Sequence, residues 1–149
     1  DREVALEAVR DHGLALKYIS EELRGDRGVA LEAVRQDGLA LEYASEELRS
    51  DREMVLKSVR QNGRSLMYAS ERLRGDREVV LEAVKQFGIA LKYASAEMRA
   101  DRGVVLEAVR LGIDDVTGEH ALQHASEELR GDREVALEAV RDHGLALKY

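Results

Sequence analysis

Two histidines in the second half of the chain are spaced to share one face of a helix. His120 and His124 are four residues apart and follow an acidic stretch at 114–119. A structural zinc site needs four ligands in tetrahedral geometry, and only the two histidines have suitable spacing. The stretch also differs from a calcium-binding loop, because Val116 stands where an oxygen ligand is required. We expect a polar surface insertion without a metal or cofactor, and His120 and His124 are the weak candidates for metal binding.

One serine recurs along the chain and raises the question of a nucleophile. No histidine recurs with it, so the general base that a serine nucleophile needs is missing. We expect the hydroxyl to bond to the carbonyl group one turn back, and its small size to permit close packing. No catalytic residues are predicted, and we expect that the chain is not an enzyme. The serines are Ser20, Ser45, Ser70, Ser95 and Ser126.

A tyrosine recurs in the same way. An aromatic column along one edge is typical of a binding or self-association surface, because Tyr is enriched at protein interfaces. The alternative, which we favour, is that each ring packs between neighbouring units with its hydroxyl at the surface. The possible interaction stripe consists of Tyr18, Tyr43, Tyr68, Tyr93 and Tyr149.

These residues recur because the chain is a tandem repeat. An Asp-Arg dipeptide opens every unit, at spacings of 25 residues with one of 31. Repeats of this length are typical of solenoids, in which each unit is stabilised by its neighbours. The units are residues 1–25, 26–50, 51–75, 76–100, 101–131 with six extra residues around Leu111 to Glu119, and a truncated copy at 132–149.

Within a unit, the pattern predicts two short helices. Asp1 is a good N-cap, and apolar residues follow it with helical period. We expect Gly13 to end the first helix in the left-handed conformation, and a second helix to run from Leu14 to Arg24. Helices this short are marginal in water on their own. The sequence therefore predicts an all-α fold, an α-solenoid of two-helix hairpin repeats with a period of about 25 residues.

Two stretches carry a resemblance to a known family. DREVVLEAVKQFGIALKYAS (residues 76–95) and DREVALEAVRDHGLALKYIS (residues 1–20) resemble domain-of-unknown-function family 4116. The Asp-Arg start, the glycine and the Tyr-Ala-Ser match the family, although the first copy has Ile in place of the Ala, and the resemblance covers essentially the whole chain. The resemblance implies no activity, cofactor or catalytic residue. The fifth unit departs from the family pattern, because His120 replaces a leucine and His124 a tyrosine, and we expect the regular stack to be interrupted there.

The two ends of the chain are identical over 18 residues. Residues 132–149 repeat residues 1–18 without a difference, which indicates a higher-order period of 131 residues. The chain does not begin with Met, and it ends within the second helix of its last unit. Three explanations stay open: a cut from a longer array, end-to-end joining of copies, or a window that overlaps itself in a continuous fibre.

Charge and composition narrow the classes of partner. The net charge is −7, and basic residues alternate with acidic ones, which argues against nucleic acid. For the same reason Arg2, Arg24 and their equivalents are expected to form surface ion pairs rather than a phosphate-binding stripe. No segment is long and apolar enough to span a membrane, and cysteine is absent.

The sequence therefore predicts a non-enzymatic structural repeat protein. We expect it to self-assemble end to end into a fibre or to form part of a longer solenoid. Its partners would then be copies of itself or a longer parent array. The alternative is an α-solenoid scaffold that binds another protein through its extended surface.

Overall fold

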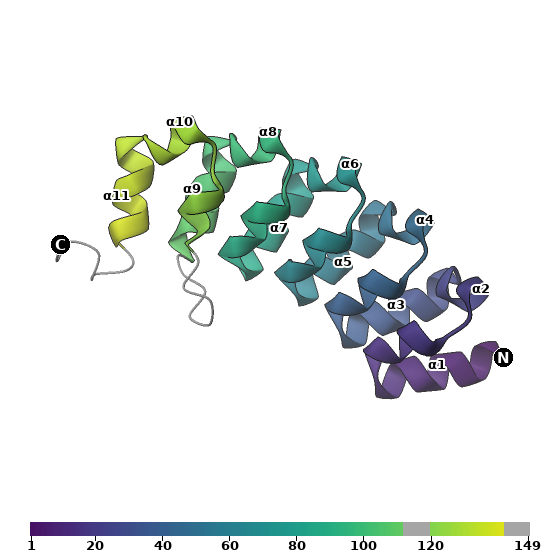
Figure 1. The fold of residues 1–149 in the computed structure, drawn as a ribbon. Coiled ribbons are helices and arrows are strands. Elements are labelled where there is room, and N and C mark those ends of the chain that lie inside the picture. Colours follow the sequence, from purple (N-terminus) through teal and green to yellow (C-terminus); the bar gives the residue numbers. More distant parts are fainter. Residues whose placement is uncertain (112–119, 142–149) are drawn as a thin grey trace.

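Each of the first five units contains three helical segments in the computed structural model, which describes residues 1–111 and 120–141. A long α-helix is followed by a 3-10 helix and then by a single turn of α-helix (Figure 1). The long helices are α1 (Arg2–Asp11), α3 (Arg27–Gln36), α5 (Arg52–Gln61), α7 (Arg77–Gln86), α9 (Arg102–Arg110) and α11 (Arg133–Arg141). The 3-10 helices are η1 (Gly13–Tyr18), η2 (Gly38–Tyr43), η3 (Gly63–Tyr68), η4 (Gly88–Tyr93) and η5 (Ala121–His124). The short helices are α2 (Glu21–Arg24), α4 (Glu46–Arg49), α6 (Glu71–Arg74), α8 (Ala96–Arg99) and α10 (Glu127–Arg130).

The units stack in sequence order into a curved arch (Figure 1). Each long helix packs on the next long helix, and α3, α5, α7 and α9 also pack on the 3-10 helix of the preceding unit. The short helices α4, α6, α8 and α10 follow one another along one edge of the arch (Figure 1). The predicted all-α solenoid with a 25-residue period is confirmed.

Columns of apolar side chains run through the stack. One valine and one leucine of each of the first four units, and the valine of the fifth, have no solvent exposure, as the sequence pattern predicts. The valines are Val9, Val34, Val59, Val84 and Val109, and the leucines are Leu16, Leu41, Leu66 and Leu91. The invariant leucine at Leu6 and its equivalents lies nearer the surface, and four of its copies are half-buried. The core is therefore shared between units rather than enclosed within any one of them.

The second helix of the predicted hairpin is divided into two pieces. Ile19 and Ser20 have extended backbone (ψ 150° and 154°), which separates η1 from α2. The Ser45 hydroxyl accepts a hydrogen bond of 3.4 Å from the Leu48 amide, so this serine caps the short helix that follows it. Ser95 and Ser126 cap α8 and α10 in the same way. The prediction that these hydroxyls bond back to a carbonyl group is wrong, because no continuous helix passes through them.

Backbone hydrogen bonds also link successive units along this edge. The Ser45 amide donates to the Arg24 carbonyl oxygen at 3.3 Å. The equivalent bonds are Ser70 to Arg49, Ser95 to Arg74 and Ser126 to Arg99, at 2.8 to 2.9 Å. The last of these follows the six-residue insertion, so the stack is regular again at α10. Residues 112–119, where this insertion falls, lie outside the described residues.

The glycine after each long helix has a different role from the predicted one. The backbone leaves α1 in extended conformation at His12 (φ −153°, ψ 103°), and Gly13 begins η1. No glycine in the described part of the chain has a φ angle in the left-handed region. The prediction of a left-handed helix end is therefore wrong, and a second cause must explain the recurring glycine.

That cause is the close approach of the next unit. A Cβ atom on Gly13 or Gly38 would lie 2.5 Å from the carbonyl oxygen of Ala33 or Ser58 in the following long helix. The equivalent atoms on Gly63 and Gly88 would come even closer to the next helix. Since these neighbours are backbone atoms, they cannot rotate away as a flexible side chain would. Glycine is required because two backbones touch at this point.

We expect Gly63→Ala to lower the free energy of unfolding by about 2–4 kcal/mol, because the methyl group would separate η3 from α7 or distort both. The matched control is Gly75→Ala at the end of α6, where the nearest atom would lie 3.4 Å away and Ala100 occupies the equivalent position. Urea unfolding followed by circular dichroism measures both. Equal destabilisation by the two substitutions would contradict the close-approach explanation.

Candidate interaction surfaces

The Asp-Arg dipeptide at the start of each unit joins it to the unit before. Asp26 caps its own helix, because its carboxylate accepts a hydrogen bond of 3.0 Å from the Val29 amide. The same carboxylate pairs with the preceding unit, with 2.9 Å between Arg2 Nε and Asp26 Oδ2. The predicted ion pairs of this arginine are thus present in every successive pair of units. The others are Arg27–Asp51, Arg52–Asp76, Arg77–Asp101 and Arg102–Asp132, at 2.9 to 3.7 Å.

These contacts favour the ionised aspartates. The hydrogen bond from Arg52 lowers the pKa of Asp76, and the Val79 amide acts in the same direction against the opposing effect of burial. The hydrogen bond from Arg2 likewise lowers the pKa of Asp26. A carboxyl group with a lowered pKa in the folded state stabilises the fold above its unfolded pKa, which is about 4. That contribution is lost as the pH falls through the folded pKa.

We expect Asp76→Asn to lower the melting temperature near pH 7 and to have a smaller effect near pH 3. Asn still caps a helix, so the change removes mainly the charge. In a double-mutant cycle, the coupling between Arg52→Gln and Asp76→Asn should be smaller at pH 3 than at pH 7. A coupling of equal size at the two pH values would show that the pairing does not depend on the ionised carboxylate.

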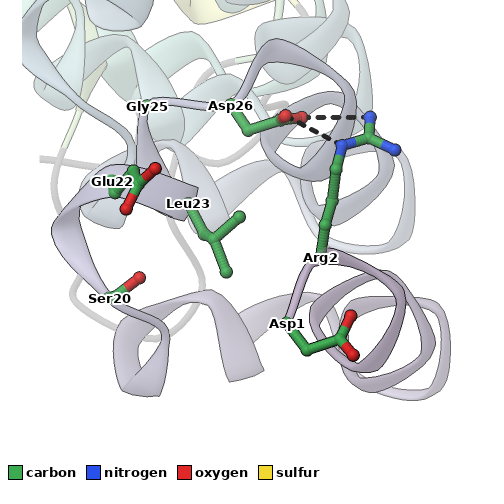
Figure 2. Close-up of a pocket in the computed structure, with 7 residues that line it drawn as sticks. All are labelled: Asp1, Arg2, Ser20, Glu22, Leu23, Gly25 and Asp26. Carbon is green, nitrogen blue, oxygen red and sulfur yellow. Dashed lines mark hydrogen bonds and ion pairs between the residues drawn. The ribbon is translucent and has the colours of Figure 1, made fainter.

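The N-terminal end of the arch carries a hollow of about 520 Å³ (Figure 2). Arg2 reaches from α1 to Asp26 on one side of it, and Ser20 and Glu22 lie on the other. Leu23 lies between the two sides and is half-buried, whereas its equivalents in the inner units are buried. In the inner units, a preceding unit lies against this surface.

Other apolar side chains at the two ends are likewise more exposed than their equivalents in the inner units. Val4 is 63% exposed, although its equivalents in the following units have no exposure. Tyr18 is 81% exposed, whereas the tyrosines of the next units are half-buried. At the opposite end, Leu137 on α11 is 56% exposed. We call the surface around Val4 and Leu23 the N-terminal face, and the surface of α11 around Leu137 the C-terminal face.

The described tyrosines of the predicted stripe lie at the ends of the 3-10 helices, and their role in an interaction stays a prediction. Tyr43, Tyr68 and Tyr93 are half-buried and pack against the core. A hydrogen bond with Glu42 raises the pKa of Tyr43. Burial raises the pKa of Tyr68, and Glu42, Tyr43 and Tyr93 act in the same direction. The rings therefore pack between units and still present an edge to solvent. Tyr149 lies outside the described residues.

A second column of arginines lies along the edge of short helices. Arg24, Tyr43, Ser45 and Glu46 surround a groove of about 350 Å³ between α2 and α4. Arg24 Nη2 lies 3.8 Å from the exposed Glu21 carboxylate. The Nε atom is buried without a hydrogen-bond partner, and the same is true in the next three copies, Arg49, Arg74 and Arg99. These three make no ion pair within the described ranges, which differs from the predicted surface pairing.

The structure does not assemble a metal site from the residues it describes. His120 is exposed and His124 is half-buried. No group of three or more His, Cys, Asp or Glu side chains within the described ranges could hold a metal ion. The acidic stretch at 114–119 lies outside them, so the expectation of a polar insertion stays a prediction. Within the same ranges, no helix is both long and apolar enough to cross a membrane.

The stacked units and their shared core define an α-solenoid repeat protein. The family described as Domain of unknown function (DUF4116) matches the chain in five overlapping segments, residues 1–49, 26–74, 51–99, 76–114 and 101–149. The chain therefore belongs to this family. The first three matches each span two consecutive units, which agrees with the dependence of one unit on the next. Neither curated proteins nor solved structures give a match.

Proposed function

We propose that this protein is a non-enzymatic structural repeat protein that extends through its stacking contacts. Extension joins it end to end with further copies of itself or continues it within a longer solenoid. The exposure of Val4 carries the proposal, because the same position has no exposure wherever a preceding unit is present. Burying an apolar side chain of this size contributes about 1.5–3 kcal/mol. Covering the N-terminal face with another unit is therefore favourable.

The C-terminal face offers the matching contacts. Arg133 occupies the position from which Arg2 reaches Asp26 in the first pair of units. A copy stacked on α11 in the same register would bring its Asp1 carboxylate to Arg133 and its Val4 side chain against α11. The apolar and ionic contacts of the inner units would then be repeated between copies.

We expect the wild-type chain to show concentration-dependent self-association in sedimentation velocity, and Val4→Arg to abolish it. The substitution places a charge in the proposed interface while leaving the single chain folded, because Val4 makes few contacts within it. The matched control is Met67→Arg, a lateral side chain that is 41% exposed and far from both faces.

Retained association of Val4→Arg, with the same dependence on concentration as the wild type, would exclude the N-terminal face as the interface. A wild-type chain that stays monomeric at every concentration tested would contradict the proposal that copies of this chain assemble end to end. Negative-stain microscopy of the same samples distinguishes linear fibres from closed or disordered aggregates.

The half-buried tyrosine column favours a second function, lateral binding of another protein by the array. Tyrosine offers a rigid apolar surface with a polar tip and is enriched at interfaces. Successive rings from η2, η3 and η4 form one continuous edge, so a partner would contact several units at once. This function does not require free ends and is compatible with end-to-end stacking.

A further inference from the structure

The long helices at the two ends of the arch have the same sequence. α1 and α11 are the outermost long helices (Figure 1), and residues 1–10 are identical to residues 132–141. In α11 this sequence packs on α9, and Val135 has no exposure there, whereas the equivalent Val4 is 63% exposed. The α9–α11 junction is therefore a template for the contacts that α1 would make with a long helix lying before it.

Ion pairs lie near both ends of the helices at this junction. Near the start of the two helices, Arg102 of α9 pairs with Asp132 and Glu134 of α11. Near their ends, Arg110 of α9 pairs with Glu138 of α11, with 3.2 Å between Nε and Oε1. Two arginines of one long helix thus bind three carboxylates of the next.

This double pairing depends on which glutamates the following unit carries. α7 has glutamates at the same two positions as α11, and both pair with α5, Arg52 with Glu78 and Arg60 with Glu82. α3 and α9 have glycine at the first of the two positions. Among the described residues, their only ion pair with the preceding long helix is that of the capping aspartate. Ion pairs near both helix ends therefore occur where both glutamates are present.

α1 carries both glutamates, but they have no basic partner. Glu3 and Glu7 are exposed, and neither they nor the Asp1 carboxylate form an ion pair with any described residue. On α11, Arg133 and Arg141 are exposed and have no acidic partner within the same ranges. The two faces are therefore complementary in charge, and the complementary residues occupy the positions that pair between α9 and α11.

We propose that Glu3 and Glu7 select the occupant of the N-terminal face, which is the C-terminal face of a second copy stacked head to tail. The inference deepens the proposed end-to-end stacking and rests on it. Arg133 of one copy pairs with Asp1 and Glu3 of the other. Arg141 pairs with Glu7 near the other end of the helices. Two N-terminal faces would instead bring carboxylates together, and this repulsion gives the contact its direction.

Sedimentation velocity of the full chain tests this selection with two opposite charge reversals. Glu3→Arg brings a cation to Arg133, and Arg133→Glu brings an anion to the N-terminal face. Each variant alone should therefore self-associate about tenfold more weakly than the wild type. An equimolar mixture should recover most of the association, because each altered face then meets the opposite charge. Both chains should stay folded, which thermal melting checks, because the two side chains are exposed and unpaired in the single chain.

The matched control is Glu71→Arg, the same change of charge at an exposed position of α6 away from both faces. It should associate as tightly as the wild type. A general attraction between the two reversed chains cannot account for recovery in the mixture. The wild type has a net charge of −7, so both reversed chains remain negative.

Two results would overturn the ionic selection while apolar stacking stands. One is wild-type association of Glu3→Arg when Val4→Arg does not associate. The other is a mixture that associates no more tightly than its two components, since Glu3 and Arg133 would then not meet. A wild-type chain that does not self-associate would overturn this inference together with the proposed stacking.

Discussion

The contact between each glycine and the long helix of the next unit constrains the whole array. At Gly13, Gly38, Gly63 and Gly88 the backbone of a 3-10 helix touches a carbonyl group of the following helix, with no room for a side chain. Such a contact sets both the distance and the angle between units. Since the same contact recurs at the first four steps, the same displacement is applied at each of them, and this part of the array becomes a regular arch. The buried valine and leucine columns align because this step is constant.

Polar groups add specificity to the packing between units. Each aspartate at the start of a long helix satisfies its own helix and an arginine of the unit before, so one carboxylate serves both local and long-range structure. At three of the short helices the first serine, Ser45, Ser95 or Ser126, has a comparable double role through its amide and its hydroxyl. Both residues lie at unit boundaries, and a shift in register would break the helix caps and the inter-unit bonds together. This explains why Asp, Arg and Ser recur as faithfully as the buried residues.

Much of this arrangement could be predicted from the sequence, because the copies of the repeat can be compared with one another within the chain. The period, the helical class and the Val9 and Leu16 columns follow from apolar residues at fixed positions. The break in the second helix was missed, although Ser45 followed by two glutamates is a typical N-cap signal. The predicted role of Gly13 was also wrong, since a glycine that ends a helix and a glycine at a close backbone contact give the same sequence pattern. The unpaired Nε atoms of the second arginine column could not be predicted from the sequence either. Alternating acidic and basic residues suggest ion pairs, but only the structure shows which partners are within reach.

The backbone bonds from Ser45 to Arg24, and from each later serine to the arginine before it, have a mechanical consequence. They lie at the four junctions between the first five units and are similar at each one, so a tension applied to the ends of this part of the array would load them in series. A unit that gives way releases 25 residues, which extend to roughly 80–90 Å, compared with about 10 Å while folded. The remaining junctions keep their own contacts and hold. A stretched array would lengthen in discrete steps of nearly equal size, as an extensible tether does.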